Sequence, residues 1–216
     1  MSRKFGSPGE RIRKSTLPPP RAAFFFQVHR YNAPVNKDQL LTYLEGLDRA
    51  LERTTTLVIY GSAAFMLLDE PDRTSLDIDV AAPYSSADFG DLRRAAQSAG
   101  LPVNPEAGYS GDHIEWIAAL RLCLPKPLPE TEINLWQGAK LTIKTDPAAA
   151  LIASKLIRYD EIDQSDIRYL LAQSRTQFRE VELAVETLPA PFNTDPLVIE
   201  NLQNLKSDME FWGSTA

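Results

Sequence analysis

The spacing of apolar residues in the first half of the chain predicts alternating helices and strands. An apolar residue recurs every three or four positions over residues 40–51, which is the period of an amphipathic helix. Asn36 and Gln39 precede this segment at capping-box spacing, so we expect the helix to begin there. Residues 55–60 are β-branched and apolar throughout, which is typical of a buried strand, and residues 62–68 are predicted to form the next helix.

Strand and helix patterns continue through the middle of the chain. Residues 69–72 include Pro71 and are expected to end the helix, since proline disfavours helical backbone in the residue before it. Residues 75–80 then read as a second strand. The further predicted elements are a helix over 86–99, a strand over 113–117 and a hairpin of 132–136 with 140–144.

The last third of the chain reads as four helices. Asp146 followed by Pro147 is the pattern of a capping residue with proline at the first helical position, which predicts a helix through Arg158. Two more helices are predicted over 164–173 and 176–188 from their apolar spacing. A fourth is expected from Asp195 onward, because proline follows that residue as well and apolar residues then recur along one face.

These elements together predict a mixed α+β fold. We expect a flexible basic leader over residues 1–35 and an α/β core over 36–145, in which helices flank a short mixed sheet. A helical region over 146–216 is expected to pack on that core. The 216 residues suffice for one sizeable core, and length alone does not require two domains.

Bulk composition narrows the class of protein. The content of 44% hydrophobic and 24% charged residues is ordinary for a soluble globular protein. No uninterrupted apolar run approaches the roughly 18 residues of a membrane span, so we expect no membrane partner. The single cysteine, Cys123, has no partner for an internal disulfide, which favours a reducing cytoplasm. One cysteine and two histidines give poor support for a structural zinc site.

Charge is spread unevenly along the chain. Residues 1–30 hold seven basic side chains and one acidic one, so residues 31–216 carry a formal charge of −12 within the total of −6. An acidic body does not favour broad binding to nucleic acid, because that affinity comes from cations that neutralise phosphates. The basic leader is expected to be a solvated tail, and phosphate contacts are the alternative.

Candidate chemistry is concentrated between residues 61 and 80. Asp77 and Asp79 stand at alternate positions of a predicted strand, so both carboxylates leave the same face. Ile78 and Val80 are strand formers that would face the core. Two carboxylates fixed beside a buried element are costly without a cation, and Mg²⁺ favours carboxylates together with substrate phosphates. The sequence therefore predicts a metal site at Asp77 and Asp79.

The turn before this strand has two interpretations. Gly61 and Ser62 lie between a predicted strand and a predicted helix, where a small turn lets a phosphate approach the backbone. A simple strand-to-helix turn with Ser62 as the helix N-cap explains the serine equally well. Arg73 is a candidate to hold a phosphate or the aspartate loop, and a plain surface residue is the alternative.

The combination of Gly61-Ser62, Arg73-Thr74 and Asp77-Ile78-Asp79 resembles the DNA polymerase β-like nucleotidyltransferase superfamily in its minimal bacterial branch. The helix over 146–158, which carries Lys155 and Arg158, is similar to the Lys-x-x-Arg helix of the AbiEii/MenT-type nucleotidyltransferase toxins and their uncharacterised relatives. Asp163 and Asp166 follow it, as in the acidic helix of that group. The resemblance spans about residues 40–173.

This resemblance implies transfer of a nucleoside monophosphate from an NTP to an acceptor hydroxyl, with release of pyrophosphate. Asp77 and Asp79 would then hold two Mg²⁺ ions. Gly61 and Ser62 would bind the phosphate tail. Lys155 and Arg158 would reach the β- and γ-phosphates, and a charged, solvated helix stripe is the alternative for this pair.

The family pattern also expects a third carboxylate on a neighbouring strand, often the general base. Glu115 is our choice, because a charged residue within an apolar strand calls for a reason. Glu132 and Asp112 are the competing candidates. The non-catalytic alternative is that Glu115 is simply the solvent-facing residue of an alternating strand. His113 has no sequence partner that would make it a catalytic base.

Two functions remain open from the sequence. The first is a Mg²⁺-dependent nucleotidyltransferase that uses an NTP and acts on tRNA, a protein hydroxyl or a small molecule, within a toxin–antitoxin or defence system. The second is a catalytically degenerate protein of the same fold that serves as a nucleotide-binding or partner-binding module, such as a toxin or antitoxin partner. Which NTP is used and what oligomer forms do not follow from the residues.

Overall fold

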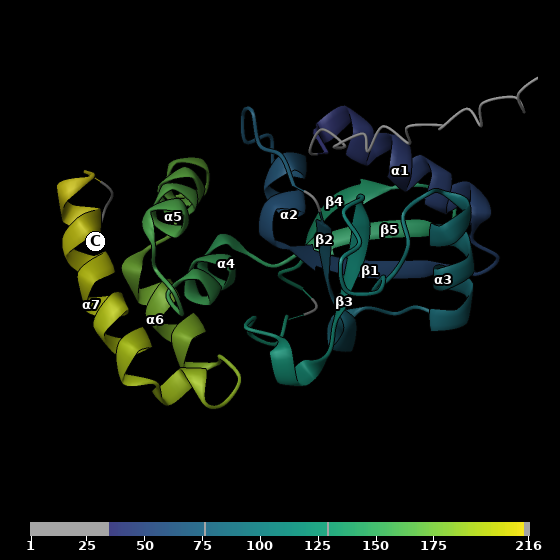
Figure 1. Cartoon of the computed structure of the whole chain (residues 1–216). Helices are drawn as coiled ribbons and strands as arrows, with labels where there is room; N and C mark the ends of the chain where they lie inside the picture. Colours follow the sequence, from purple (N-terminus) through teal and green to yellow (C-terminus); the bar gives the residue numbers. More distant parts are fainter. Residues whose placement is uncertain (1–34, 76, 129, 214–216) are drawn as a thin grey trace, which may run out of the picture. The chain divides into compact units, whose positions relative to one another are not determined.

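A computed structural model describes residues 35–75, 77–128 and 130–213 of the chain. The predicted leader over 1–35 lies outside the described residues except for Val35. The described part is a mixed α+β structure around a five-stranded sheet, as predicted. Along the chain, helices come before, between and after the strands (Figure 1). The strands are β1 (Thr55–Tyr60), β2 (Asp77–Ala81), β3 (His113–Ile117), β4 (Ile133–Gln137) and β5 (Leu141–Thr145).

The sheet has the strand order β3-β2-β1-β5-β4 and mixes both pairing directions. β1 pairs antiparallel with β2 and parallel with β5, while β2 pairs parallel with β3. β4 and β5 form the predicted hairpin, with an irregularity between Asn134 and Trp136. The parallel pairing of β2 with β3 confirms 113–117 as the neighbour of the aspartate strand.

Seven α-helices and three short 3₁₀ turns complete the regular elements of the described residues. The helices are α1 (Lys37–Ala50), α2 (Gly61–Leu67), α3 (Phe89–Ser98), α4 (Ala148–Lys155), α5 (Glu161–Gln173), α6 (Phe178–Glu186) and α7 (Pro196–Phe211). Side-chain caps explain several starts: Asn36, Asp88 and Asp160 each accept a hydrogen bond from backbone N–H groups of the first turn.

Some predicted boundaries were wrong for identifiable reasons. Ser62 is not the N-cap of α2, because the helix already begins at Gly61. The helix predicted to open at Asp146 begins at Ala148 after an N-cap at Pro147, and it makes no side-chain cap bond. Its regular part ends at Lys155 rather than Arg158, since a turn through Tyr159 at φ 55° follows.

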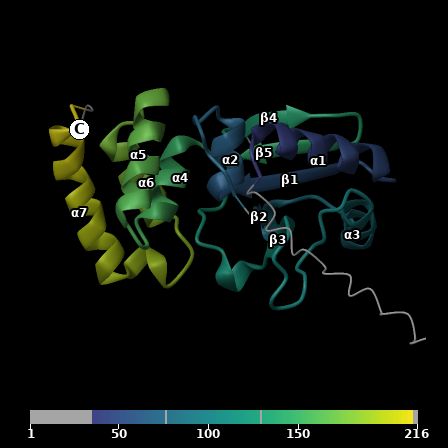
Figure 2. The same ribbon diagram turned by 45° about the horizontal axis from the view of Figure 1, so that its top comes forward.

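Buried apolar residues form two clusters. One cluster lies between the sheet and α1, α2 and α3, and includes Leu40, Leu44 and Leu92. The other joins α4, α5, α6 and α7, which neighbour one another in both views (Figures 1 and 2), with sheet residues such as Val58 and Ala81. The regularly spaced apolar residues of α6 and α7 are buried in this second cluster, as expected from their spacing.

Within the described ranges, no helix combines the length and apolar character required to cross a bilayer.

Candidate metal and phosphate site

The aspartate strand lies inside the sheet, which fixes the positions of its two carboxylates. β2 runs between β1 and β3, and Asp77 and Asp79 alternate with the buried Ile78 and Val80 as predicted. The parallel register places Glu115 of β3 opposite Asp79. Three carboxylates from neighbouring strands therefore leave the same region of the sheet.

Asp77, Glu115 and His113 form a candidate metal-ligand set. One ligand atom from each of these side chains lies within 4.8 Å of the others. The ring Nδ1 of His113 lies 2.9 Å from the carbonyl oxygen of Gly111, so it donates a proton there. That bond leaves Nε2 as the lone-pair nitrogen, 3.8 Å from Glu115 Oε1. The donors fit a divalent cation: oxygen ligands suit Mg²⁺, and the imidazole also suits Mn²⁺ or Zn²⁺.

Asp79, the other predicted metal ligand, lies outside this three-residue set, and its carboxyl is strongly perturbed. Burial, together with the negative charges of Asp77 and Glu115, raises the pKa of Asp79 to about 7. Lys155 and His113 act in the opposite direction and only partly offset these effects. Concentrated negative charge of this kind is what a bound cation would stabilise.

Gly61 is required by the position of Asp79. Its backbone has φ of 64°, in the left-handed region that favours glycine. A Cβ atom at this position would lie 2.4 Å from Asp79 Oδ2, well inside van der Waals contact. The turn after β1 thus brings backbone directly against the Asp79 carboxylate, and the phosphate approach expected at this turn stays a prediction.

Arg73 and Ser62 contact each other instead of standing separately beside the turn. The guanidinium donates to Ser62 Oγ from Nε at 3.2 Å and from Nη2 at 3.0 Å. Its Nη1 and Nη2 also donate to the buried Asp166, at 2.5 and 3.0 Å. Glu70 Oε2 lies 3.4 Å away. Arg73 is therefore a link between the turn and α5 rather than a plain surface residue.

Lys155 and Arg158 converge on the same acidic helix. Lys155 Nζ lies 2.5 Å from Asp166 Oδ2 and 3.2 Å from Asp163 Oδ1. Arg158 donates to the two oxygens of Asp163 from Nε at 2.9 Å and from Nη2 at 3.0 Å. The side chain of Lys155 is 13% exposed, which rules out the solvated-stripe alternative for that residue, whereas Arg158 remains 65% exposed.

A cavity of about 310 Å³ connects the two halves of the site. Gly61 and Asp79 form one side of its lining, and Lys155 and Arg158 form another. Residues separated by more than seventy positions in sequence thus border one space, as predicted for the aspartate strand and the Lys-x-x-Arg segment. Ser62, Arg73 and Asp77 are not part of this lining.

The competition for the third carboxylate is decided by geometry. Glu132 Oε2 lies 2.6 Å from Lys144 Nζ on β5, two strands away from β2. Asp112 Oδ2 accepts hydrogen bonds from Gln39 and Tyr43 of α1, at 2.9 and 2.7 Å. Glu115 is the candidate of the three that borders Asp77 and Asp79.

The resemblance named Asp163 and Asp166, but sequence reasoning did not predict that they hold the cations in place. Asp163 and Asp166 are buried, and together they position Lys155, Arg158 and Arg73. Both cations Arg73 and Lys155 also lie over the ring of Phe65, about 5 Å from its centroid. The spacing of Asp163 and Asp166, one turn apart on a helix, was the available signal.

The chain was compared with protein-family models, curated proteins and solved structures, and none of the three comparisons found a match.

Proposed function

We propose that this protein is a metal-dependent nucleotidyltransferase with a polymerase β-like core, which moves a nucleoside monophosphate from an NTP to an acceptor hydroxyl. The observation that carries the proposal is the shared cavity, in which Asp79 and Gly61 meet Lys155 and Arg158. A carboxylate pair that attracts a metal and a cationic pair that attracts phosphates are the two requirements of this chemistry.

The proposed reaction exchanges one phosphorus–oxygen bond for another. The acceptor oxygen bonds to the α-phosphorus, the bond from that phosphorus to its bridging oxygen breaks, and pyrophosphate leaves. Bound Mg²⁺, with two ions expected, supplies neutralisation of the phosphate charge. The proposal assigns proton acceptance from the hydroxyl to Glu115, and the pairing of Glu115 with Asp79 across β2 and β3 supports that role.

Lys155 and Arg158 retain donors for phosphate despite their ion pairs. An ammonium group has three N–H donors and a guanidinium has five. Lys155 directs its ammonium to Asp163 and Asp166, and Arg158 uses Nε and Nη2 for Asp163. The acidic helix therefore orients both cations toward the cavity and does not exhaust their donors.

The direct test is transfer of label from each of the four α-labelled NTPs to bulk tRNA, to protein or to small molecules in a cell extract. Asp77→Asn combined with Asp79→Asn is expected to abolish labelling. Glu200→Gln, an exposed acid on α7, is the matched control and is expected to label like the wild type. Equal labelling by the double variant would contradict the proposed metal site.

Binding without transfer distinguishes the degenerate alternative. Mg²⁺ with an NTP is expected to raise the melting temperature in proportion to the logarithm of ligand concentration, and the double variant is expected to lose that shift. A shift without any labelled acceptor would favour a nucleotide-binding module. Both readings place the protein in the cytoplasm, where NTPs are abundant, and a cognate toxin or antitoxin partner belongs to the same proposal.

A further inference from the structure

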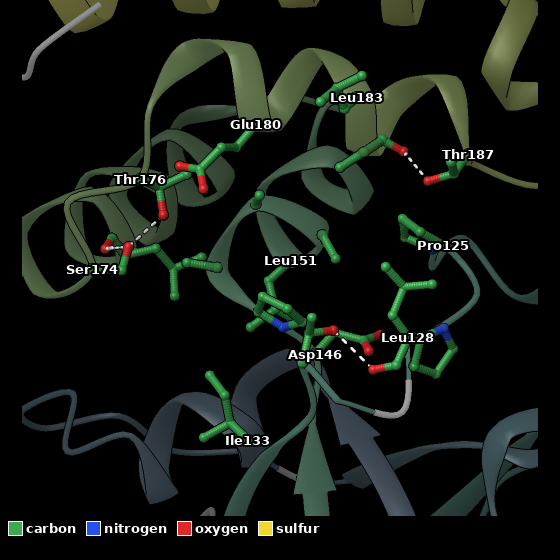
Figure 3. Close-up of a pocket in the computed structure, with 18 of the residues that line it drawn as sticks. Pro125, Leu128, Ile133, Asp146, Leu151, Ser174, Thr176, Glu180, Leu183 and Thr187 are labelled. Carbon is green, nitrogen blue, oxygen red and sulfur yellow. Dashed lines mark hydrogen bonds between the residues drawn. The ribbon is translucent and has the colours of Figure 1, made fainter.

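A second cavity has a lining that shares Leu151 with the cavity at the proposed nucleotide site. It has a volume of about 680 Å³, within the usual range of roughly 300–1,000 Å³ for small-molecule sites. Figure 3 shows its labelled apolar walls, which come from the chain before β4, from α4 and from α6: Pro125, Leu128, Ile133, Leu151 and Leu183.

Asp146 contributes a buried acidic group to this lining, which is mostly apolar. Its side chain is fully buried, and neither carboxylate oxygen has a hydrogen-bond partner among the described residues. Burial of a carboxylate without a partner is costly, so buried acids are ordinarily paired. The helix-capping role that would have explained Asp146 is absent, because Pro147 is the N-cap of α4 and makes no side-chain bond.

The charges around Asp146 leave it uncompensated. Burial, together with the negative charge of Glu132, raises the pKa of its carboxyl to about 7. Lys144 is the neighbouring base, and it lies 2.6 Å from Glu132. Glu180 and Lys126 also line the cavity, and both are exposed; Glu180 accepts a hydrogen bond from the backbone N–H of Gln177. Asp146 is therefore the buried acid of a cavity wall that is mostly apolar.

We propose that this cavity binds a small organic cation, an amine with an apolar body, whose ammonium group donates to Asp146. The ammonium supplies the opposite charge and the hydrogen bonds that Asp146 lacks within the described chain. The apolar body packs against Ile133, Leu151 and Leu183. Asp146 is closed to water, so the ammonium reaches its carboxylate when a residue of the cavity wall turns aside.

The test compares three ligands that share one ring and differ in charge. Cyclohexylamine, cyclohexanol and cyclohexanecarboxylate are titrated calorimetrically into the full chain at pH 8.5, where an aliphatic amine is still protonated because its pKa is about 10.4. The amine is expected to bind at least about tenfold more tightly than the alcohol, a difference of about 1.4 kcal/mol. The carboxylate is expected not to bind.

Two variants assign the binding to Asp146 and to the cavity. Asp146→Asn keeps the shape of the side chain and is expected to make amine and alcohol equal. Leu183→Trp adds bulk at a half-exposed wall position and is expected to weaken all binding while Asp146 remains. Glu186→Gln, on the same helix and outside the lining, is the control. Equal affinity of the wild type for amine and alcohol, unchanged amine binding in Asp146→Asn, or no binding of the amine would overturn the proposal.

Discussion

Several single positions in this chain are constrained by one neighbouring atom. Gly61 is the clearest case, because its backbone is left-handed and its missing Cβ is where Asp79 Oδ2 lies. Gly100 also has a left-handed backbone, with φ of 77°, yet no atom lies within 4 Å of a Cβ built there. The two glycines thus separate the cost of backbone strain from the cost of displacing the carboxylate.

Gly61→Ala and Gly100→Ala are therefore expected to differ in function more than in stability. Each should lower the free energy of unfolding by about 1 kcal/mol, since alanine resists a positive φ. Gly61→Ala should in addition abolish the Mg²⁺–NTP thermal shift, because its methyl group pushes Asp79 aside. Denaturant unfolding and thermal-shift titration of both variants check this. A Mg²⁺–NTP thermal shift in Gly61→Ala equal to that of the wild type would contradict this prediction, because the turn would then accommodate a Cβ without moving Asp79.

Asp146 makes a second prediction at this scale, in the dependence of stability on pH. The pKa of its carboxyl is about 7 in the folded chain and near 3.8 when unfolded, so the unfolded state loses its proton first as pH rises. The contribution of Asp146 to stability is therefore full below pH 3.8 and is lost between pH 3.8 and 7. Tyr84 and Glu132 are the titratable groups that interact with it.

Asp146→Asn removes this titration and should stabilise the chain more at pH 8 than at pH 5. The melting temperature of the variant, measured relative to wild type, is expected to be higher at pH 8 by several degrees, since about 1 kcal/mol shifts it by roughly 2–4 °C in a chain of this size. Glu200→Gln serves as the exposed control. If the melting temperature of Asp146→Asn differed from that of the wild type by the same amount at pH 5 and pH 8, the raised pKa of Asp146 would be contradicted.

At the scale of elements, the charges of α4 and α5 hold the cationic half of the site. Asp166 of α5 is fully buried and contacts both Lys155 and Arg73. These two bases approach from different elements, one at the end of α4 and one in the loop before β2. The acidic helix thus connects the predicted phosphate-binding side chains to the segment that leads into the aspartate strand.

Asp166→Asn is expected to destabilise the chain by about 3 kcal/mol, because it leaves two partly buried cations without their shared partner. Glu52→Gln breaks an exposed pair with Arg94 and is expected to cost less than about 1 kcal/mol. Urea unfolding of both variants measures the difference. Equal, small effects would mean that solvent already compensates Lys155 and Arg73.

At the scale of the whole described chain, the helices after residue 145 complete a core that the sheet begins. Val58, Phe65 and Ala81 are buried within the same cluster as residues of α4 to α7. Exposure of such a surface costs roughly 25 cal/mol for each Å² of apolar area. The sheet and its first three helices are therefore not expected to be stable without the helical region.

A chain that ends at Thr145 is expected to lose cooperative unfolding. Thermal melting followed by circular dichroism should give a broad transition for this fragment and a sharp one for the full chain. The dye ANS should bind the fragment, because apolar surface that the helices cover becomes exposed. A sharp melt without dye binding would show that residues up to 145 fold on their own.

The local pattern of the chain determined the elements and the identity of the candidate residues. Alternation in β2 set Asp77 and Asp79 on one face, and apolar spacing placed the stripe of α1 toward the core, because both depend only on strand and helix periods. Helix ends were less predictable: Asp146 looked like a cap, but the chain turns after β5 so that its carboxyl faces no N–H group.

Tertiary structure alone decided which charged groups meet. The sequence favoured Glu115 and left Glu132 and Asp112 as competitors, and strand order separated them by putting β3 beside β2 and β4 at the other edge. The pairing of Lys155 with Asp163 and Asp166, and the unpaired burial of Asp146, likewise depend on how distant elements pack. Local periodicity fixes the direction of a side chain from its own backbone, whereas its partner depends on long-range packing that no short segment encodes.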